Sequence, residues 1–150
     1  MPKNVFALLC LLPFAHYILV ASDNKPISDG QKSHNEFRAT IKSFPYSAST
    51  VRKIRIVKNY PSLRVGMDKK QVSALIGDPD YSEVDFGPKG PREHWLGSSW
   101  NYQLFMRADT INLNDPKIEI FFGTDGLLFW AVPSGISGLS EIGKCCKDSK

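Results

Sequence analysis

The chain has 150 residues, which is enough for one domain with a hydrophobic core and too few for two once an N-terminal segment is set aside. Hydrophobic residues make up 42% of it and charged residues 23%, so the composition excludes collagen-like, coiled-coil and low-complexity chains. The formal net charge of +4 is a mild basic excess, compatible with an anionic lipid surface or an acidic partner.

Residues 1–21 have the pattern of an export signal. Lys3 precedes an apolar run from Val5 to Val20, and small residues followed by a polar stretch come after it. A proline and a histidine interrupt this run, and its length just suffices to span a thinned bilayer, so an uncleaved N-terminal anchor is the alternative. Both interpretations predict that the rest of the chain lies in the periplasm or cell envelope.

The cysteines predict neither a lipid anchor nor a zinc site. Cys10 comes too early, and without small residues before it, to be a lipid acceptor. Cys145 and Cys146 are neighbours, and consecutive Cα atoms lie about 3.8 Å apart, whereas a relaxed disulfide needs roughly 4.4 to 6.8 Å. No histidine stands at ligand spacing from them. We expect free thiols, with a bond to another chain or a strained vicinal bridge as the alternatives.

Composition divides the rest of the chain into three parts. Residues 22–48 start with a run of Asp, Asn, Lys, Pro, Ser and Gly that cannot bury enough apolar area to order itself, which predicts a tether. Residues 49–133 carry the regular apolar patterns and are predicted to form one α+β domain. Residues 134–150 end in charged and polar residues and are predicted to be a C-terminal tail.

Two segments carry weaker patterns. Between Gln31 and Phe44 apolar residues recur at helical spacing and a proline follows, which predicts a possible short helix within the tether. From Val51 to Val57 the pattern fits a strand, in which Ile54 and Ile56 alternate with a cation. It fits a helix equally, because an apolar residue recurs every three positions. Both assignments stay open for this stretch.

The segment Leu63–Pro79 predicts a short capped helix. Asp68 can accept hydrogen bonds from the free amides of the first turn, and Gln71, three residues on, can complete a capping box. The apolar stripe of this helix consists of Val72, Leu75 and Ile76. Gly77 supplies the left-handed residue that ends the helix. A helix of about nine residues is not stable alone in water, so the stripe must pack against another element.

Three runs rich in apolar residues predict strands at residues 100–106, 117–122 and 127–132. In the first of them the apolar side chains share one face: Trp100, Tyr102, Leu104 and Met106. Asp125-Gly126 predicts a hairpin between the other two, because this pair tolerates positive φ. The predicted fold class is α+β, with two short helices packed on a three-stranded antiparallel β-meander. Residues 81–97 and 108–116 are predicted to be long loops.

Several of these motifs follow one another in a defined order: Leu63-Arg64-Val65-Gly66-Met67, Gln71-Val72, Leu75-Ile76-Gly77, Pro79, Trp100, Tyr102 and Asp125-Gly126-Leu127. Together they cover about half of the chain and resemble the BamE (SmpA/OmlA) outer-membrane assembly family. The resemblance implies two helices with a three-stranded sheet, a fold shared with β-lactamase inhibitor proteins, and a binding or scaffold role. The chain departs from the family at Asn101, between Trp100 and Tyr102, where members tend to carry an exposed aromatic residue.

Five residues are predicted to contact a partner: Tyr81, Phe86, Trp95, Asn101 and Arg64. The three aromatic residues lie in a stretch framed by glycine and proline that cannot easily bury them, and packing over the sheet edge is the alternative. Arg64 belongs to the densest basic zone of the chain, which consists of Arg52, Lys53, Arg55, Lys58, Arg64, Lys69 and Lys70. This zone could bind anionic lipid or an acidic partner, or it could form a solvated face.

No catalytic, metal or cofactor site is predicted. His94 has no second histidine at metal spacing, and Ser137 misses the nucleophile-elbow pattern. Nucleic acid is not expected as a partner, because an exported protein does not meet it. The leading hypothesis is therefore a non-catalytic cell-envelope binding or scaffold protein, related to outer-membrane assembly factors, with an envelope protein as its partner. The alternative is an inhibitor or immunity protein that binds a secreted hydrolase.

Overall fold

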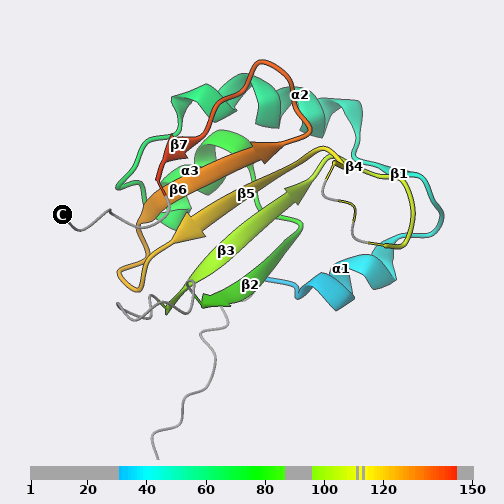
Figure 1. Ribbon diagram of the computed structural model, residues 1–150, viewed down its shortest axis with the longest axis horizontal. Helices are drawn as coiled ribbons and strands as arrows, with labels where there is room; N and C mark the ends of the chain where they lie inside the picture. Colours follow the sequence, from blue (N-terminus) through cyan, green and yellow to red (C-terminus); the bar gives the residue numbers. More distant parts are fainter. Residues whose placement is uncertain (1–30, 87–95, 111, 113, 145–150) are drawn as a thin grey trace, which may run out of the picture.

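The computed structural model describes residues 31–86, 96–110, 112 and 114–144 (Figure 1). Its helical elements are α1 (His34–Thr40), α2 (Thr50–Asn59), the 3-10 turn η1 (Tyr60–Ser62) and α3 (Lys69–Ile76). Its strands are β1 (Tyr46–Ser47), β2 (Tyr81–Phe86), β3 (Leu96–Gln103), β4 (Phe105–Met106), β5 (Lys117–Phe122), β6 (Leu128–Ser134) and β7 (Ile142–Gly143). Among the described helices, none has the length and apolarity needed to cross a membrane. The predicted export signal, His94, Trp95 and the paired cysteines lie outside the described residues.

The predicted arrangement of two helices on a three-stranded meander is wrong. The chain is α+β, but its described residues form three α-helices and two sheets. One sheet has five antiparallel strands in the order β2-β3-β5-β6-β7, and the other pairs β1 with β4. The expected meander is therefore only the centre of a larger sheet, which β2 and β7 extend on its two sides.

Both added strands lie where the sequence predicts a loop or a tail. β2 occupies the first part of the predicted loop 81–97 and pairs in register with β3. Apolar and polar residues alternate in β2 over only a few positions. The adjoining segment is rich in glycine and proline, which are typical of turns, so the whole stretch was predicted to be a loop. β7 has two residues, too few to show a period, and it exists through long-range pairing with Trp130 and Ala131 of β6.

α3 begins and ends where the sequence predicts. The Asp68 carboxylate accepts from the Gln71 amide at 2.8 Å, and the Gln71 side chain accepts from the Asp68 amide at 3.0 Å. Gly77 follows the helix with φ +88°, a conformation that suits glycine. The Tyr102 hydroxyl donates to the Gly77 carbonyl at 2.9 Å, which fixes the end of α3 to β3.

α2 is a helix, which resolves the open assignment of its central residues. Ser49 caps it by accepting from the Arg52 amide at 3.3 Å. Ile56 is fully buried, whereas Val51 and Ile54 are 79% and 59% exposed. The apolar residues thus point in several directions around the helix, and this is why their spacing alone did not decide between helix and strand.

The main hydrophobic core lies between the five-stranded sheet and the helices α2 and α3, which Figure 1 shows together on one side of the sheet. Alternate residues of β5 point into it and are fully buried. Its buried members are Ile56, Tyr60, Leu63, Val72, Ile76, Trp100, Tyr102, Leu104, Ile118, Ile120, Phe122, Leu128 and Ala131. The predicted contact between the stripe of α3 and the apolar side of β3 is part of this core.

A second, smaller core lies where α1 meets β2 and β4. It consists of Phe37, Tyr81 and Met106, with Ile41, Phe44 and Tyr46 packed against it. α1 begins with its own capping box, formed by Ser33 and Glu36. The Ser82 amide donates to the Lys32 carbonyl at 2.8 Å, so the chain before α1 runs beside β2. The predicted short helix is confirmed, and it packs on the sheet.

The predicted strand 100–106 divides at Leu104. The amides of Leu104 and Phe105 both donate to the Pro116 carbonyl, at 2.9 and 3.2 Å, and the chain bends there. Leu104 stays in the main core, whereas Met106 belongs to the second core. The expectation that Met106 shares a face with Trp100 is therefore wrong, because the bend changes the side toward which the following residues point.

Candidate functional site

The five-stranded sheet has a polar side that points away from α2 and α3, and we call it the outer face. The register places on it Tyr81, Glu83, Ser99, Asn101, Gln103, Lys117, Glu119, Phe121, Trp130 and Val132. An antiparallel sheet often leaves one such face to solvent. Here, however, Ser99 and Asn101 are only 2% exposed and Gln103 only 6%. Buried polar groups are informative, because they need partners.

A pocket of about 190 Å³ lies on the outer face, beside α1. Residues of α1, β2, β3, β4 and β5 form its walls, together with residues of the segment 107–116. Its charged and aromatic lining residues are His34, Tyr81, Glu83, Asp115, Lys117 and Glu119. Met106 and uncharged polar side chains complete the lining. The pocket therefore joins the second core to the polar part of the sheet.

Asp115 is a buried carboxylate of this lining. It is 2% exposed and stands just before β5. Its Oδ2 accepts from the Arg107 amide at 2.9 Å, while its buried Oδ1 finds no hydrogen-bond donor in the part of the chain that the structure describes. A buried acceptor without a donor costs about 1–3 kcal/mol, and more when the group is charged. A group that donates to Oδ1 would recover this free energy.

Asn101 provides a second acceptor of the same kind. It is 2% exposed, and its amide nitrogen donates to Ser99 Oγ at 3.3 Å. Its Oδ1 is buried and has no donor among the described residues. Its partners on the two neighbouring strands, Tyr81 and Glu119, both line the pocket. The two unpartnered acceptors thus belong to one region of the outer face.

The charges around the pocket are mostly negative. Glu83, Asp115 and Glu119 contribute carboxylates, and Lys117 contributes an ammonium group 2.9 Å from Glu119 Oε2. No group of three or more His, Cys, Asp or Glu side chains within the described ranges is arranged to hold a metal ion. The arrangement suits a positively charged group that donates hydrogen bonds.

Tyr81 forms one wall of the pocket. Its ring stacks on His34 with the centroids 4.7 Å apart and on Phe37 at 5.6 Å. Burial raises the pKa of the Tyr81 hydroxyl, and the carboxylates of Glu83 and Glu119 raise this pKa further. Tyr81, predicted to be an exposed residue of a loop, is thus a buried residue of β2 that lines the pocket.

The other predicted partner residues are spread over the molecule. Asn101 lies inside the sheet, beside the pocket. Phe86 is the last residue of β2, but its side chain, like all of Trp95, lies outside the described part of the chain. Arg64 is exposed in the segment between η1 and α3, where its guanidinium donates to the Pro61 and Leu63 carbonyls, both at 2.6 Å. The structure thus brings Tyr81 and Asn101 together and places Arg64 elsewhere.

Several cations of the predicted basic zone make contacts within the fold. Arg55 donates to the carbonyls at the end of α3, those of Ser73, Ala74 and Leu75, at 3.1 to 3.3 Å. The ammonium of Lys69 lies 5.7 Å from the centre of the Trp100 ring and 5.4 Å from that of Phe122. These contacts give Arg55 and Lys69 a role within the fold.

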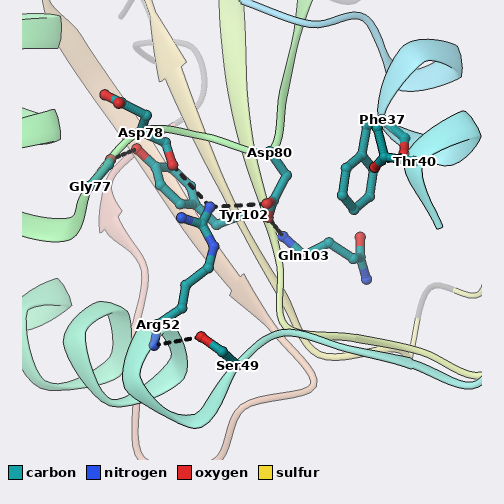
Figure 2. Close-up of polar contacts among 9 residues, drawn as sticks. All are labelled: Phe37, Thr40, Ser49, Arg52, Gly77, Asp78, Asp80, Tyr102 and Gln103. Carbon is teal, nitrogen blue, oxygen red and sulfur yellow. Dashed lines mark hydrogen bonds and ion pairs between the residues drawn. The ribbon is translucent and has the colours of Figure 1, made fainter. Parts of the chain in front are cut away.

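Arg52 belongs to a polar network between α2 and the sheet, which Figure 2 shows. Its guanidinium lies 3.1 Å from Asp80 Oδ1 and donates to the Asp78 carbonyl at 2.9 Å. Asp80 Oδ2 accepts from the Gln103 amide at 2.7 Å. The ring of Tyr102 lies 5.7 Å from the Arg52 guanidinium. Each of these groups connects two elements of the fold, so the network has a structural role.

Compared with known proteins, the chain matches no family model, no curated protein and no solved structure. The resemblance to outer-membrane assembly proteins therefore stays a prediction from sequence motifs. Three buried side-chain atoms lack a hydrogen-bond partner among the described residues: Arg52 Nε in the network beside α2, and two acceptors, Asp115 Oδ1 and Asn101 Oδ1, on the outer face. The two acceptors make the outer face the candidate binding region.

Most of the pocket was not predicted from the sequence. His34 lies far in sequence from Asp115, Lys117 and Glu119, and no motif links it to them. One signal was present: Lys117 and Glu119 alternate with buried isoleucines in β5, which assigns both to the face opposite the core. Asp115 looked like an ordinary loop residue, and only the fold reveals its burial.

Proposed function

We propose that the protein is a non-catalytic binding protein of the bacterial cell envelope, and that the outer face of its sheet binds an envelope protein. The observation that carries the proposal is the pair of buried acceptors, Asp115 Oδ1 and Asn101 Oδ1, that lack donors among the described residues. Folded proteins leave few buried polar atoms unpaired. Two such atoms beside one pocket suggest that a binding partner supplies the missing hydrogen-bond donors.

The opposite end of the outer face adds apolar contact area. Phe121 and Trp130 stack with their ring centroids 4.7 Å apart, and Phe129 lies 6.4 Å from Phe121. All three side chains are half-buried. Aromatic residues are enriched at protein interfaces, because they supply large contact areas at a low entropic cost. This cluster, which we call the aromatic end, supports a protein as the partner.

The support for the proposed location and scaffold role comes from sequence patterns. The export pattern of residues 1–21 supports the cell envelope. The motifs around α3 support a relation to outer-membrane assembly factors, but the five-stranded sheet and α1 differ from the fold that the resemblance implies. The binding role is therefore argued from the outer face.

Affinity capture from envelope fractions tests the proposal. The full chain is compared with Phe121→Ala, which removes a ring from the aromatic end, and with Val51→Ser, a control on the exposed side of α2. We expect the wild type and the control to retain the same envelope protein and Phe121→Ala to lose most of it, with thermal unfolding confirming that each variant is folded.

Two results would contradict the proposal. Equal capture by Phe121→Ala would show that the outer face is not the binding surface. Recovery of a soluble hydrolase whose activity is blocked would support the inhibitor hypothesis instead.

A further inference from the structure

One residue that lines the pocket beside α1 has a hydrogen-bond acceptor without a donor in the described part of the chain, and a second such acceptor lies next to the lining. Asp115 Oδ1 has no donor among the residues that the structure describes, and neither has Asn101 Oδ1, which lies between two lining residues of the neighbouring strands. A ligand that completes the site must therefore donate hydrogen bonds. A carboxylate or the dianion of a phosphate monoester only accepts them and would leave both oxygens unpaired.

The charge of the residues that line the pocket also favours a ligand that donates hydrogen bonds, because it favours a cation. Three carboxylates, those of Glu83, Asp115 and Glu119, face one ammonium, that of Lys117. Since Lys117 pairs with Glu119 at 2.9 Å, the remaining charge of the lining is negative. Burial first and these glutamates second raise the pKa of the neighbouring Tyr81 hydroxyl. A cation entering the pocket is attracted, and an anion is repelled.

The size and the walls limit the ligand further. The pocket measures about 190 Å³, and a protein cavity of about 150 Å³ holds one benzene molecule. Met106 and the stacked rings of His34 and Tyr81 supply apolar wall on the side of α1. These dimensions suit one cationic group on a short alkyl chain.

We infer that this pocket binds a primary ammonium or guanidinium group carried on a short alkyl chain, with Asp115 as its main hydrogen-bond acceptor. The inference rests on the proposed binding function and specifies what the partner presents at the outer face. The group has two possible sources, a free alkylamine or the lysine or arginine side chain of a protein partner. The aromatic end on the same face favours the side chain.

Calorimetric titration of the full chain tests the inference with small probes. n-Butylammonium and n-butylguanidinium are compared with n-butanol, which is neutral, and with butyrate, which is an anion. We expect binding of at least one of the two cations, weakened by added salt, and no binding of butanol or butyrate. Equal binding of butanol or butyrate would overturn the inference.

Two variants change the affinity in opposite directions. Asp115→Asn removes the charge and replaces the free oxygen by an amide nitrogen, so cation binding should weaken about tenfold or more. Lys117→Gln removes the competing ammonium, so binding should tighten several-fold. Glu141→Gln is the control, since Glu141 accepts from Trp130 Nε1 outside the pocket. If Asp115→Asn does not fold, Lys117→Gln still decides: unchanged or weaker binding there would overturn the inference.

A peptide probe separates the two sources. An acetylated peptide with one internal lysine between apolar residues, and its twin with an internal arginine, are titrated beside the free amines. Tighter binding of either peptide assigns the pocket to a protein side chain, and tighter binding of the free amine assigns it to a small molecule. Amine binding without envelope-protein capture would leave the pocket inference standing and remove the proposed partner. Capture of an envelope protein without amine binding would leave the proposed partner standing and remove the pocket inference.

Discussion

Arg52 reaches from α2 to the sheet, where its guanidinium lies 3.1 Å from Asp80 Oδ1. The Asp80 side chain is 12% exposed and that of Arg52 is 28% exposed. Burial raises the pKa of the Asp80 carboxyl above its ordinary value, while Arg52 and the Gln103 amide oppose this increase. Because the folded state holds the proton more tightly than the unfolded state, this carboxyl contributes most to stability below about pH 3.8. Its contribution is lost as the pH rises through the folded pKa.

Arg52→Gln should therefore raise the pKa of Asp80 further, and a carboxyl NMR titration measures this change. The free energy of unfolding at pH 7 should fall by about 1–3 kcal/mol. This is less than the roughly 3–5 kcal/mol of a fully buried pair, because Arg52 is partly exposed. Arg38→Gln breaks the pair with Asp109, which is 59% exposed, and should cost under about 1 kcal/mol. An Asp80 pKa at or below the wild-type value in Arg52→Gln would contradict this explanation.

α3 is held to the sheet by the two residues of its stripe that point directly into the main core. Val72 and Ile76 are fully buried, whereas Leu75 is half-buried and packs against the core. The Leu75 carbonyl accepts from the Asn59 side chain at 3.0 Å, which fixes the two helices to each other. The helix therefore has one side on the sheet and one beside α2.

Ile76→Ala should lower the free energy of unfolding by about 2–5 kcal/mol, the usual range for a buried isoleucine. Leu75→Ala should cost clearly less, because part of this side chain already contacts water. Urea unfolding followed by circular dichroism measures both values. A larger loss for Leu75→Ala than for Ile76→Ala would show that the stripe packs differently.

Across the whole molecule, the sequence correctly predicted those elements that form through contacts between residues close in sequence. The caps of α3 and the hairpin at Asp125-Gly126 depend on neighbouring residues, and both occur as expected. The Gly126 φ of +75° has the sign that this turn requires. These elements show that capping and turn chemistry can be interpreted directly from the sequence.

The features that the sequence did not predict form through contacts between residues far apart in the chain. The bend at Leu104 needs the Pro116 carbonyl, and β7 needs β6. The pocket needs α1, which packs through Phe37 on β2 across a long stretch of sequence. No local pattern encodes such contacts. Of the residues at the candidate site only Tyr81 and Asn101 were predicted, and neither was predicted because of the pocket, which Tyr81 lines and Asn101 adjoins.

The most direct test of the pocket on the outer face as a cation-binding site is a ¹⁵N–¹H correlation spectrum recorded while n-butylammonium is added. The account predicts shifts confined to the amides around the pocket, in residues 81–83, 101–103 and 115–119, with those of α2 unchanged. Shifts concentrated in α2, or no saturable shift at all, would contradict it.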